Sequence, residues 1–248
     1  MDIAEAVAAQ KRGDLTPEAF VRLIMGPREW HLPARSQEDG QTGLALVKNE
    51  EGTWLQVFSR VGYLRAYVAS RGEPAEMVTV DGHRVGQMLG PPITGVNFDA
   101  GTDHGFHYAE DRLPMLKRMS EATRIAQILA GERVAGSWQA LRDYAHWRVA
   151  YGEGADDGSR QLMLAPDGEG NRLVAVFSAP DTSAAFCDAV HAQLGFQPEL
   201  LEVPGEDLFK TLATLPVDGM VFDPAGPIAP CAVKLAFAQR VLERSSAD

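Results

Sequence analysis

The chain has 248 residues, 45% of them hydrophobic and 23% charged, which suffices for a hydrophobic core without disulfides or metals. Its net charge of −11, with no Lys- or Arg-rich block to offset it, argues against nucleic acid and anionic membranes as partners. No apolar run approaches the roughly 18 residues of a transmembrane helix, and residues 1–10 lack the basic start of a signal peptide, so we expect a cytoplasmic protein.

The first half of the chain has the pattern of a small α/β unit. The apolar spacing alternates between the helical period and the extended period, with Gly- or Pro-containing turns between segments. Pro92 ends the last helical segment, because proline cannot continue a helix. In chain order we expect a helix, a strand at Trp30, a hairpin of residues 43–47 and 54–59, a helix over 61–68, a strand over 76–80, a short helix over 82–89 and a strand over 95–98.

The second half repeats this order. Residues 54–59 (Trp-Leu-Gln-Val-Phe-Ser) correspond to residues 173–178 (Leu-Val-Ala-Val-Phe-Ser), a shift of 119 positions from Phe58 to Phe177. Phe98 corresponds to Phe222, a shift of 124. Ordered agreement at several places indicates an internal duplication. We therefore predict that Phe58, Phe98, Phe177 and Phe222 are buried at equivalent positions.

Residues 111–133 separate the copies. Leu116, Met119, Ala126 and Leu129 recur at helical spacing, so this segment is predicted to be a helix with one apolar face. The fold class follows as α+β, with α and β elements mixed. Two tandem homologous domains, residues 1–110 and 134–248, each contain a mixed β-sheet with packed helices.

Several short segments, more clearly in the second copy than in the first, resemble a known family. Residues 176–178 (Val-Phe-Ser), 203–205 (Val-Pro-Gly) and 216–226, with its Phe-Asp-Pro-Ala-Gly turn, are similar to the SseB N-terminal domain family, and residues 92–101 carry the pattern more weakly, with Ala100 in place of the proline. This family is associated with enhanced serine sensitivity and with type III secretion. The resemblance covers nearly the whole chain as two tandem copies. It implies a bacterial, cytoplasmic, non-catalytic protein of an accessory, chaperone-like or toxin-immunity kind.

The two cysteines lie in patterns interpreted as helical. We expect Cys187 and Cys231 to act as small buried hydrophobic residues, with a reactive or bridging role as the alternative. Two thiols without a disulfide framework fit a reducing compartment.

Repeated polar residues close each copy's strands. Asp99 and Asp223 each precede a Gly-containing turn, where an Asp typically accepts hydrogen bonds from nearby backbone amides. Ser59 and Ser178 each precede a helix and are expected to be its N-cap.

The turn after Asp99 contains further candidate ligands. Asp103, His104 and His107 could contribute to a metal site, but a third well-spaced ligand is missing and a solvated turn is favoured. The second copy has Pro227 to Pro230 at this place. We expect no metal and no cofactor.

No nucleophile, metalloprotease or phosphate-loop motif occurs, so we expect no enzymatic activity. Aromatic and titratable side chains instead suggest contact surfaces. For each, burial in the core is the alternative. The candidate binding residues are His104, Phe106, His107, Tyr108, Trp138 and Trp147.

The expected function is therefore binding of another protein, a toxin, a secreted substrate or a second copy, with a basic partner favoured by the acidic charge. The alternative is a small-ligand protein that holds an amino acid or metabolite in the cleft between the copies.

Overall fold

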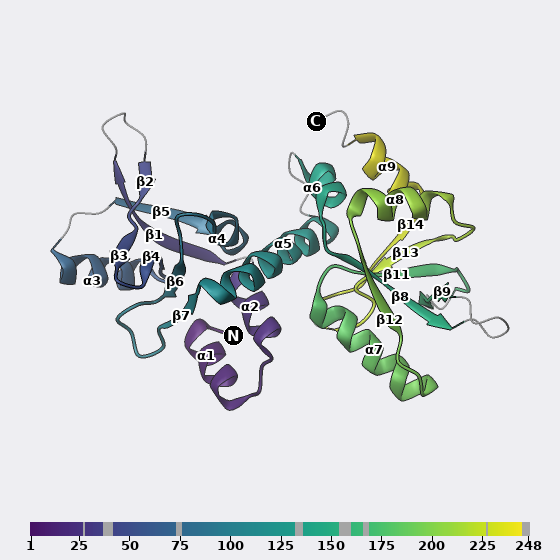
Figure 1. Ribbon diagram of the computed structural model, residues 1–248, viewed down its shortest axis with the longest axis horizontal. Helices are drawn as coiled ribbons and strands as arrows, with labels where there is room; N and C mark the ends of the chain where they lie inside the picture. Colours follow the sequence, from purple (N-terminus) through teal and green to yellow (C-terminus); the bar gives the residue numbers. More distant parts are fainter. Residues whose placement is uncertain are drawn as a thin grey trace. The chain divides into compact units, whose positions relative to one another are not determined.

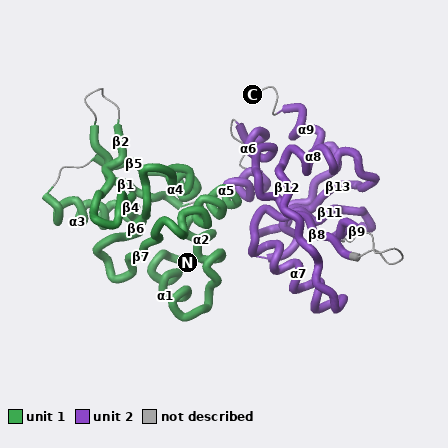
Figure 2. The backbone as a smooth tube through the Cα atoms, in the orientation of Figure 1, with its two compact units in different colours: residues 1–123 green, residues 124–248 purple. Residues whose placement is uncertain are grey.

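The computed structural model describes residues 1–26, 28–36, 42–72, 76–131, 136–153, 160–165, 169–226 and 228–244. It divides into two compact units, residues 1–123 and 124–248, and Figure 2 shows that the boundary falls within one helix. That helix is α5 (Leu113–Leu129), which lies inside the segment expected to connect the copies. Residues 132–135, where the second domain was expected to begin, lie outside the described residues.

Unit 1 contains the elements predicted for the first copy, preceded by one more helix (Figure 1). Its elements are α1 (Ile3–Arg12), α2 (Pro17–Met25), β1 (Glu29–Ser36), β2 (Thr42–Leu44), β3 (Val47–Asn49), β4 (Gly52–Val57), α3 (Val61–Arg71), β5 (Glu76–Asp81), α4 (Gly82–Met88), β6 (Gly95–Phe98), β7 (Phe106–Ala109) and a 3-10 turn (Glu110–Arg112) before α5.

Unit 2 repeats this order from the second helix onward. Its elements are α6 (Ser137–Asp143), β8 (Trp147–Glu153), β9 (Arg160–Leu162), β10 (Leu164–Ala165), β11 (Leu173–Phe177), α7 (Pro180–Leu194), β12 (Glu199–Val203), α8 (Gly205–Thr214), β13 (Gly219–Phe222), β14 (Cys231–Lys234) and α9 (Ala236–Arg244).

The sheets are mixed, which confirms the α+β class. In unit 2 the strand order is β12-β8-β11-β13-β14, with β11 and β13 parallel and the other pairs antiparallel. Unit 1 has the order β2-β1-β5 in one sheet and β3-β4-β6-β7 in another, with β4 and β6 parallel. A bridge between His31 and Phe58 joins β1 to the end of β4. The two units therefore share one strand order.

The predicted hairpin is more complex than a simple pair of strands. In unit 1 its first strand divides, so that β2 pairs with β1 and β3 pairs with β4. At the bend between them the Ala45 amide donates to the Pro33 carbonyl over 2.8 Å. The same bend occurs in unit 2, where the Met163 amide donates to the Ala150 carbonyl over 2.8 Å. This bend brings one strand into contact with two different partners.

Two further expectations were wrong. His107 was expected to lie in the turn after Asp99, but residues 106–109 form β7, an edge strand antiparallel to β6. Residues 231–234 were interpreted as helical, but they form β14, antiparallel to β13. Cys231 therefore lies on a strand, whereas Cys187 lies on α7 as expected and is buried. Each of these edge strands has four residues, which is too short for a clear periodic signal.

The core confirms the burial predicted from the repeat. Phe58, Phe98 and Phe177 are fully buried, and Phe222 is 1% exposed. Their positions are equivalent, because Phe98 pairs with the residue before Phe58 and Phe222 pairs with the residue before Phe177.

Each sheet also holds a buried tryptophan at the start of its first long strand. The Trp30 indole N–H donates to the Ile24 carbonyl over 2.8 Å, and that of Trp147 donates to the Leu141 carbonyl over 3.1 Å. Each ring contacts the repeated phenylalanine of the last parallel strand, with centroids 5.1 Å apart for Trp30 and Phe98. The indole thus ties the preceding helix to the sheet in both units.

Candidate functional site

The repeated aspartates lie at the ends of β6 and β13, and both adopt positive φ, 48° at Asp99 and 49° at Asp223. Asp99 accepts hydrogen bonds from the Ser59 amide and hydroxyl, each over 2.7 Å. Asp223 accepts from the Ser178 amide over 2.9 Å and from the Ser178 hydroxyl over 2.7 Å. Each carboxylate therefore joins the ends of two parallel strands, across 40 residues of sequence in unit 1 and 45 in unit 2.

This geometry adds to one expectation and corrects another. Asp99 and Asp223 were expected to accept hydrogen bonds within their own turns, and each carboxylate also accepts from an amide at the end of the preceding parallel strand, Ser59 or Ser178. The serines were expected to cap the following helices. The N-cap residues are instead Arg60 and Ala179, neither with a side-chain capping bond. Each hydroxyl donates to a buried carboxylate in a charge-assisted hydrogen bond, which is stronger than a neutral one, whereas at a helix N-terminus its oxygen would accept from backbone amides.

The surroundings of the two carboxylates differ between copies. In unit 1 the imidazole Nε2 of His104 lies 3.3 Å from Asp99 Oδ2, the same oxygen that accepts the Ser59 hydroxyl. In unit 2 the hydroxyl of Thr182 donates to Asp223 Oδ1 over 2.6 Å. Nucleophile activation by a histidine requires that the imidazole itself accept the serine proton. Here the carboxylate accepts it, and the geometry is that of a structural link.

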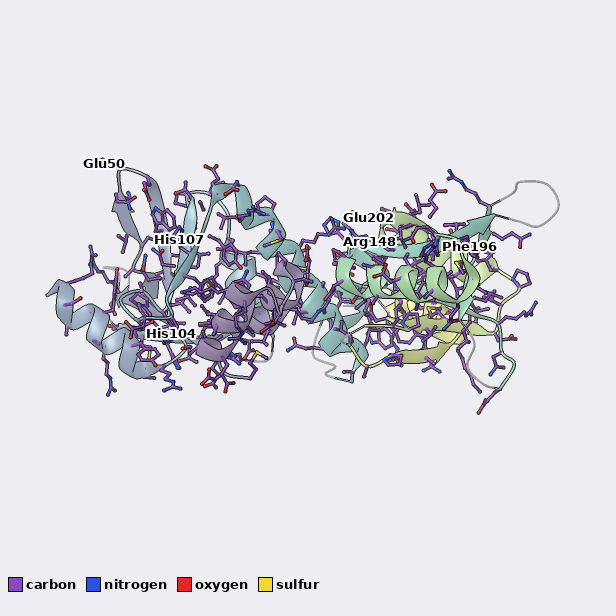
Figure 3. All side chains as sticks on the ribbon, turned by 90° about the horizontal axis from the view of Figure 1, so that it is seen from below. Glu50, His104, His107, Arg148, Phe196 and Glu202 are labelled. Atoms are coloured by element: carbon purple, nitrogen blue, oxygen red, sulfur yellow. The ribbon has the colours of Figure 1, made fainter. Side chains whose placement is uncertain are left out.

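The residues weighed as metal ligands are not all brought together. His104 contacts Asp99, whereas His107 is exposed on β7 and its ring packs against Trp54, with centroids 5.9 Å apart. The two histidines are separate in Figure 3. Over the described part of the chain, no group of three or more His, Cys, Asp or Glu side chains could hold a metal ion. Pro227, in the matching turn of the second copy, lies outside the described residues.

The remaining candidates on β7 alternate as a strand should. Phe106 is half-buried and stacks on Phe98, with centroids 4.8 Å apart and planes 12° from parallel. Tyr108 is half-buried and meets Phe98 edge-on at 6.4 Å. Phe106 and Tyr108 therefore pack against the core, which was the alternative to a binding role, whereas His107 is exposed.

Burial raises the pKa of the Tyr108 phenol to about 12, against a smaller opposing effect of Arg112. The neutral phenol is thus favoured in the folded state, so this stabilisation is complete below about pH 10 and is lost as the pH rises through 12. We expect Tyr108→Phe to lose less unfolding free energy between about pH 10 and 12 than the wild type, by under about 1 kcal/mol for a half-buried group. Urea unfolding across this range measures it, and equal losses would contradict the assignment.

The two tryptophans proposed for binding have different environments. Trp147 is completely buried and belongs to the core, which corrects its proposal as a contact residue. Trp138 on α6 is half-buried, with its ring 5.6 Å from that of Phe237 and the guanidinium of Arg244 5.7 Å above it. Trp138 keeps some accessible surface.

A surface that the sequence reasoning missed lies along β12, the edge strand of the unit 2 sheet. Large apolar side chains at the end of α7, in the following loop and on β12 itself are exposed. They are Leu194 (64%), Phe196 (38%), Leu200 (37%) and Leu201 (46%), and we name them the β12 patch. The adjacent leucines of the Glu-Leu-Leu-Glu sequence could have indicated it, because neighbouring strand residues point to opposite faces and both cannot enter one core.

Register places this patch on both sides of the strand. Leu200 pairs with Ala150 of the core that α7 covers, whereas Leu201 pairs with Val149 on the opposite face. Phe196 lies over Gly152, whose missing Cβ would be 3.5 Å from the ring. In Figure 3, Arg148 and Glu202 lie together, and Phe196 lies farther along the same unit.

Charged side chains flank the β12 patch. Glu202 Oε1 lies 2.8 Å from His146 Nδ1, and its Oε2 lies 3.4 Å from Arg148. Glu199 contacts Arg160 over 3.1 Å. An apolar stripe bordered by charged residues is typical of a protein contact surface.

No protein-family model matches the chain, and no curated protein matches it. Among solved structures, Anabaena Tic22 (protein transport) is a neighbour with a TM-score of 0.24 and 10% sequence identity, covering 82% of this chain and 88% of that chain. A TM-score this low carries no argument about fold or function. In the described residues, no helix has the length and apolar character needed to cross a membrane.

Proposed function

We propose that the protein is a non-catalytic binding protein that takes up an extended segment of another protein along the outer edge of β12. The exposed β12 patch carries the proposal. Edge strands present backbone groups to which a further strand can add, and natural proteins usually protect them. Here large apolar side chains border the edge on both faces instead.

The binding mode follows from the strand geometry. A segment added to β12 would gain main-chain hydrogen bonds, and its alternating side chains would contact the two halves of the patch. One row would lie toward Leu194, Phe196 and Leu200, and the other toward Leu201. Main-chain hydrogen bonds and apolar contacts would provide the affinity. The pattern of alternating side chains in the bound segment would determine the specificity.

The charge of the protein supports a partner of defined chemistry. The chain carries −11 overall, although Glu199 and Glu202 on β12 themselves pair with Arg160 and with His146 and Arg148. Complementary charge accelerates encounter and disfavours acidic competitors. The favoured partner segment therefore alternates apolar residues with lysine or arginine.

The wider role is proposed from the resemblance to the SseB N-terminal domain family. It favours a bacterial accessory protein, with chaperone-like or toxin-immunity function and a secreted substrate or toxin as partner. A cytoplasmic location accords with Cys187 and Cys231, neither of which forms a disulfide.

We expect Leu201→Lys to weaken binding of such a segment by about tenfold or more, because it places a charge where apolar contact is needed and repels a basic partner. Fluorescence polarisation with a labelled ten-residue peptide that alternates valine and lysine measures this. Met77→Lys is the control, since it introduces the same charge at an exposed apolar residue (43%) of the corresponding edge strand β5, outside the β12 patch.

Two further peptides separate strand addition from simple adhesion. The same peptide with N-methyl groups on alternate residues keeps its side chains but loses backbone donors, so its binding should fall. A glutamate version should bind more weakly than the lysine version. The proposal is overturned if Leu201→Lys and Met77→Lys bind the basic peptide equally well, or if N-methylation has no effect.

A further inference from the structure

Unit 1 contains a pocket of about 300 Å³ beside the bend between β2 and β3. Three cationic side chains and one tyrosine lie among its lining residues, and none of the lining residues within the described ranges is acidic. The lining comprises Pro33, Arg35, Ala45, Leu46, Val47, Lys48, Tyr67, Val68 and Arg71. The chain has 34 acidic and 23 basic residues, so a pocket lined by three basic side chains and no acidic one among the described residues departs from its overall composition.

The fold builds this pocket from three elements. β1 contributes Arg35 at its end, the divided hairpin strand contributes Lys48, and α3 contributes Tyr67 and Arg71 from its last turns. Tyr67 is held in place by the buried Phe58, with ring centroids 5.1 Å apart. The Arg71 guanidinium lies 5.7 Å from the Tyr67 ring centroid. An aromatic wall with a cation above it is thus already assembled.

The second copy shows what this corner becomes without the cations. Arg35 pairs with Gly43 next to the bend, and Gly152 pairs with Gln161 at the same place in unit 2. Gly152 therefore occupies the position of Arg35, and the ring of Phe196 covers it.

The helix gives the same comparison. Tyr67 packs on Phe58 as Phe186 packs on Phe177, so Val190, four residues after Phe186, occupies the position of Arg71. Val190 and Phe186 belong to a closed apolar cluster in unit 2. One copy fills this corner with hydrophobic side chains, whereas the other leaves it open and places positive charge around it.

We propose that this pocket binds a small organic anion, a carboxylate or phosphate attached to an apolar or aromatic body. Arginine guanidinium groups match carboxylate and phosphate oxygens in a two-pronged geometry, and lysine adds a point charge. Tyr67 and Val68 offer a surface for the body of the ligand. The volume lies at the lower end of the range for small-molecule sites, which fits a ligand of about one ring.

Isothermal titration of the full chain with four probes tests the chemistry. Phenyl phosphate and benzoate contain both parts, inorganic phosphate lacks the body, and benzyl alcohol lacks the charge. We expect phenyl phosphate or benzoate to bind at least tenfold more tightly than the last two, and added salt to weaken binding. The stronger of the two identifies phosphate or carboxylate as the head group. Equal binding of benzyl alcohol, or no binding of either aromatic anion, overturns the proposal.

Variants locate the site. Arg71→Val and Arg35→Gly introduce the residues of the second copy at exposed positions, and each is expected to weaken the preferred anion at least tenfold. Val68→Trp, which keeps all three cations but fills the pocket, should also abolish binding. Arg65→Val removes an exposed cation of α3 outside the pocket and is the control. Binding that is unchanged in Arg71→Val and Val68→Trp, or equally reduced in Arg65→Val, overturns the assignment.

Discussion

Replacing Asp223 by alanine is expected to lower the free energy of unfolding of unit 2 by about 3 kcal/mol or more. The buried carboxylate accepts from the Ser178 amide, the Ser178 hydroxyl and the Thr182 hydroxyl, and all three donors would lose this acceptor inside the protein. Alanine would also have to adopt the positive φ of 49° that Asp tolerates better. Hydrogen exchange of peptides that cover β11 and β13 measures the loss within unit 2.

Asp223→Asn is the matched variant. Asparagine tolerates the same backbone conformation and keeps one carbonyl acceptor, so the loss should be about 1 kcal/mol. Asp99→Ala is expected to act in the same way on unit 1. If Asp223→Ala and Asp223→Asn lose equal stability, or if neither loses any, the strand-end link does not stabilise the unit as inferred.

Trp147→Ala is expected to destabilise unit 2 by about 3–5 kcal/mol, because it empties a large, fully buried site and leaves the Leu141 carbonyl without its indole donor. The ring also contacts Tyr144, Phe209 and Phe222, so several elements would lose packing together. Denaturant unfolding followed by far-UV circular dichroism measures the change.

Trp138→Ala serves as the control for the same residue type. Trp138 is half-buried and contacts Phe237 and Arg244 near the surface, so we expect a loss of about half that size or less. Equal losses for the two tryptophans, or a Trp147→Ala variant with unchanged stability, would contradict the assignment of Trp147 to the core.

These folding effects are separable from the binding proposals. Leu201, Arg35 and Arg71 are exposed, so their substitution should leave the melting temperature within a few degrees of the wild type. Asp223 and Trp147 are buried, and their loss should alter binding only through loss of folded protein.

The α+β class and the burial of Phe58, Phe98, Phe177 and Phe222 were predictable from the amino-acid pattern. This was possible because apolar periodicity and a repeated order of elements are local signals that two copies report independently. The helix that spans the boundary between the units was predictable for the same reason, since its apolar spacing extends over several turns. Edge strands β7 and β14 were missed because four residues carry too little pattern.

The contacts between polar side chains became visible only in the folded chain. Asp99 binds Ser59, 40 residues away, and Asp223 binds Ser178, 45 residues away, and nothing in the local sequence distinguishes these bonds from those of a turn or a helix cap. The same holds for the cations around the unit 1 pocket and for the leucines of β12. Arg35, Lys48 and Arg71 come from three elements, and the exposure of Leu201 depends on β12 being an edge strand. Strand order and the packing of separate elements against one another decide whether such side chains line a pocket, border an edge or enter the core.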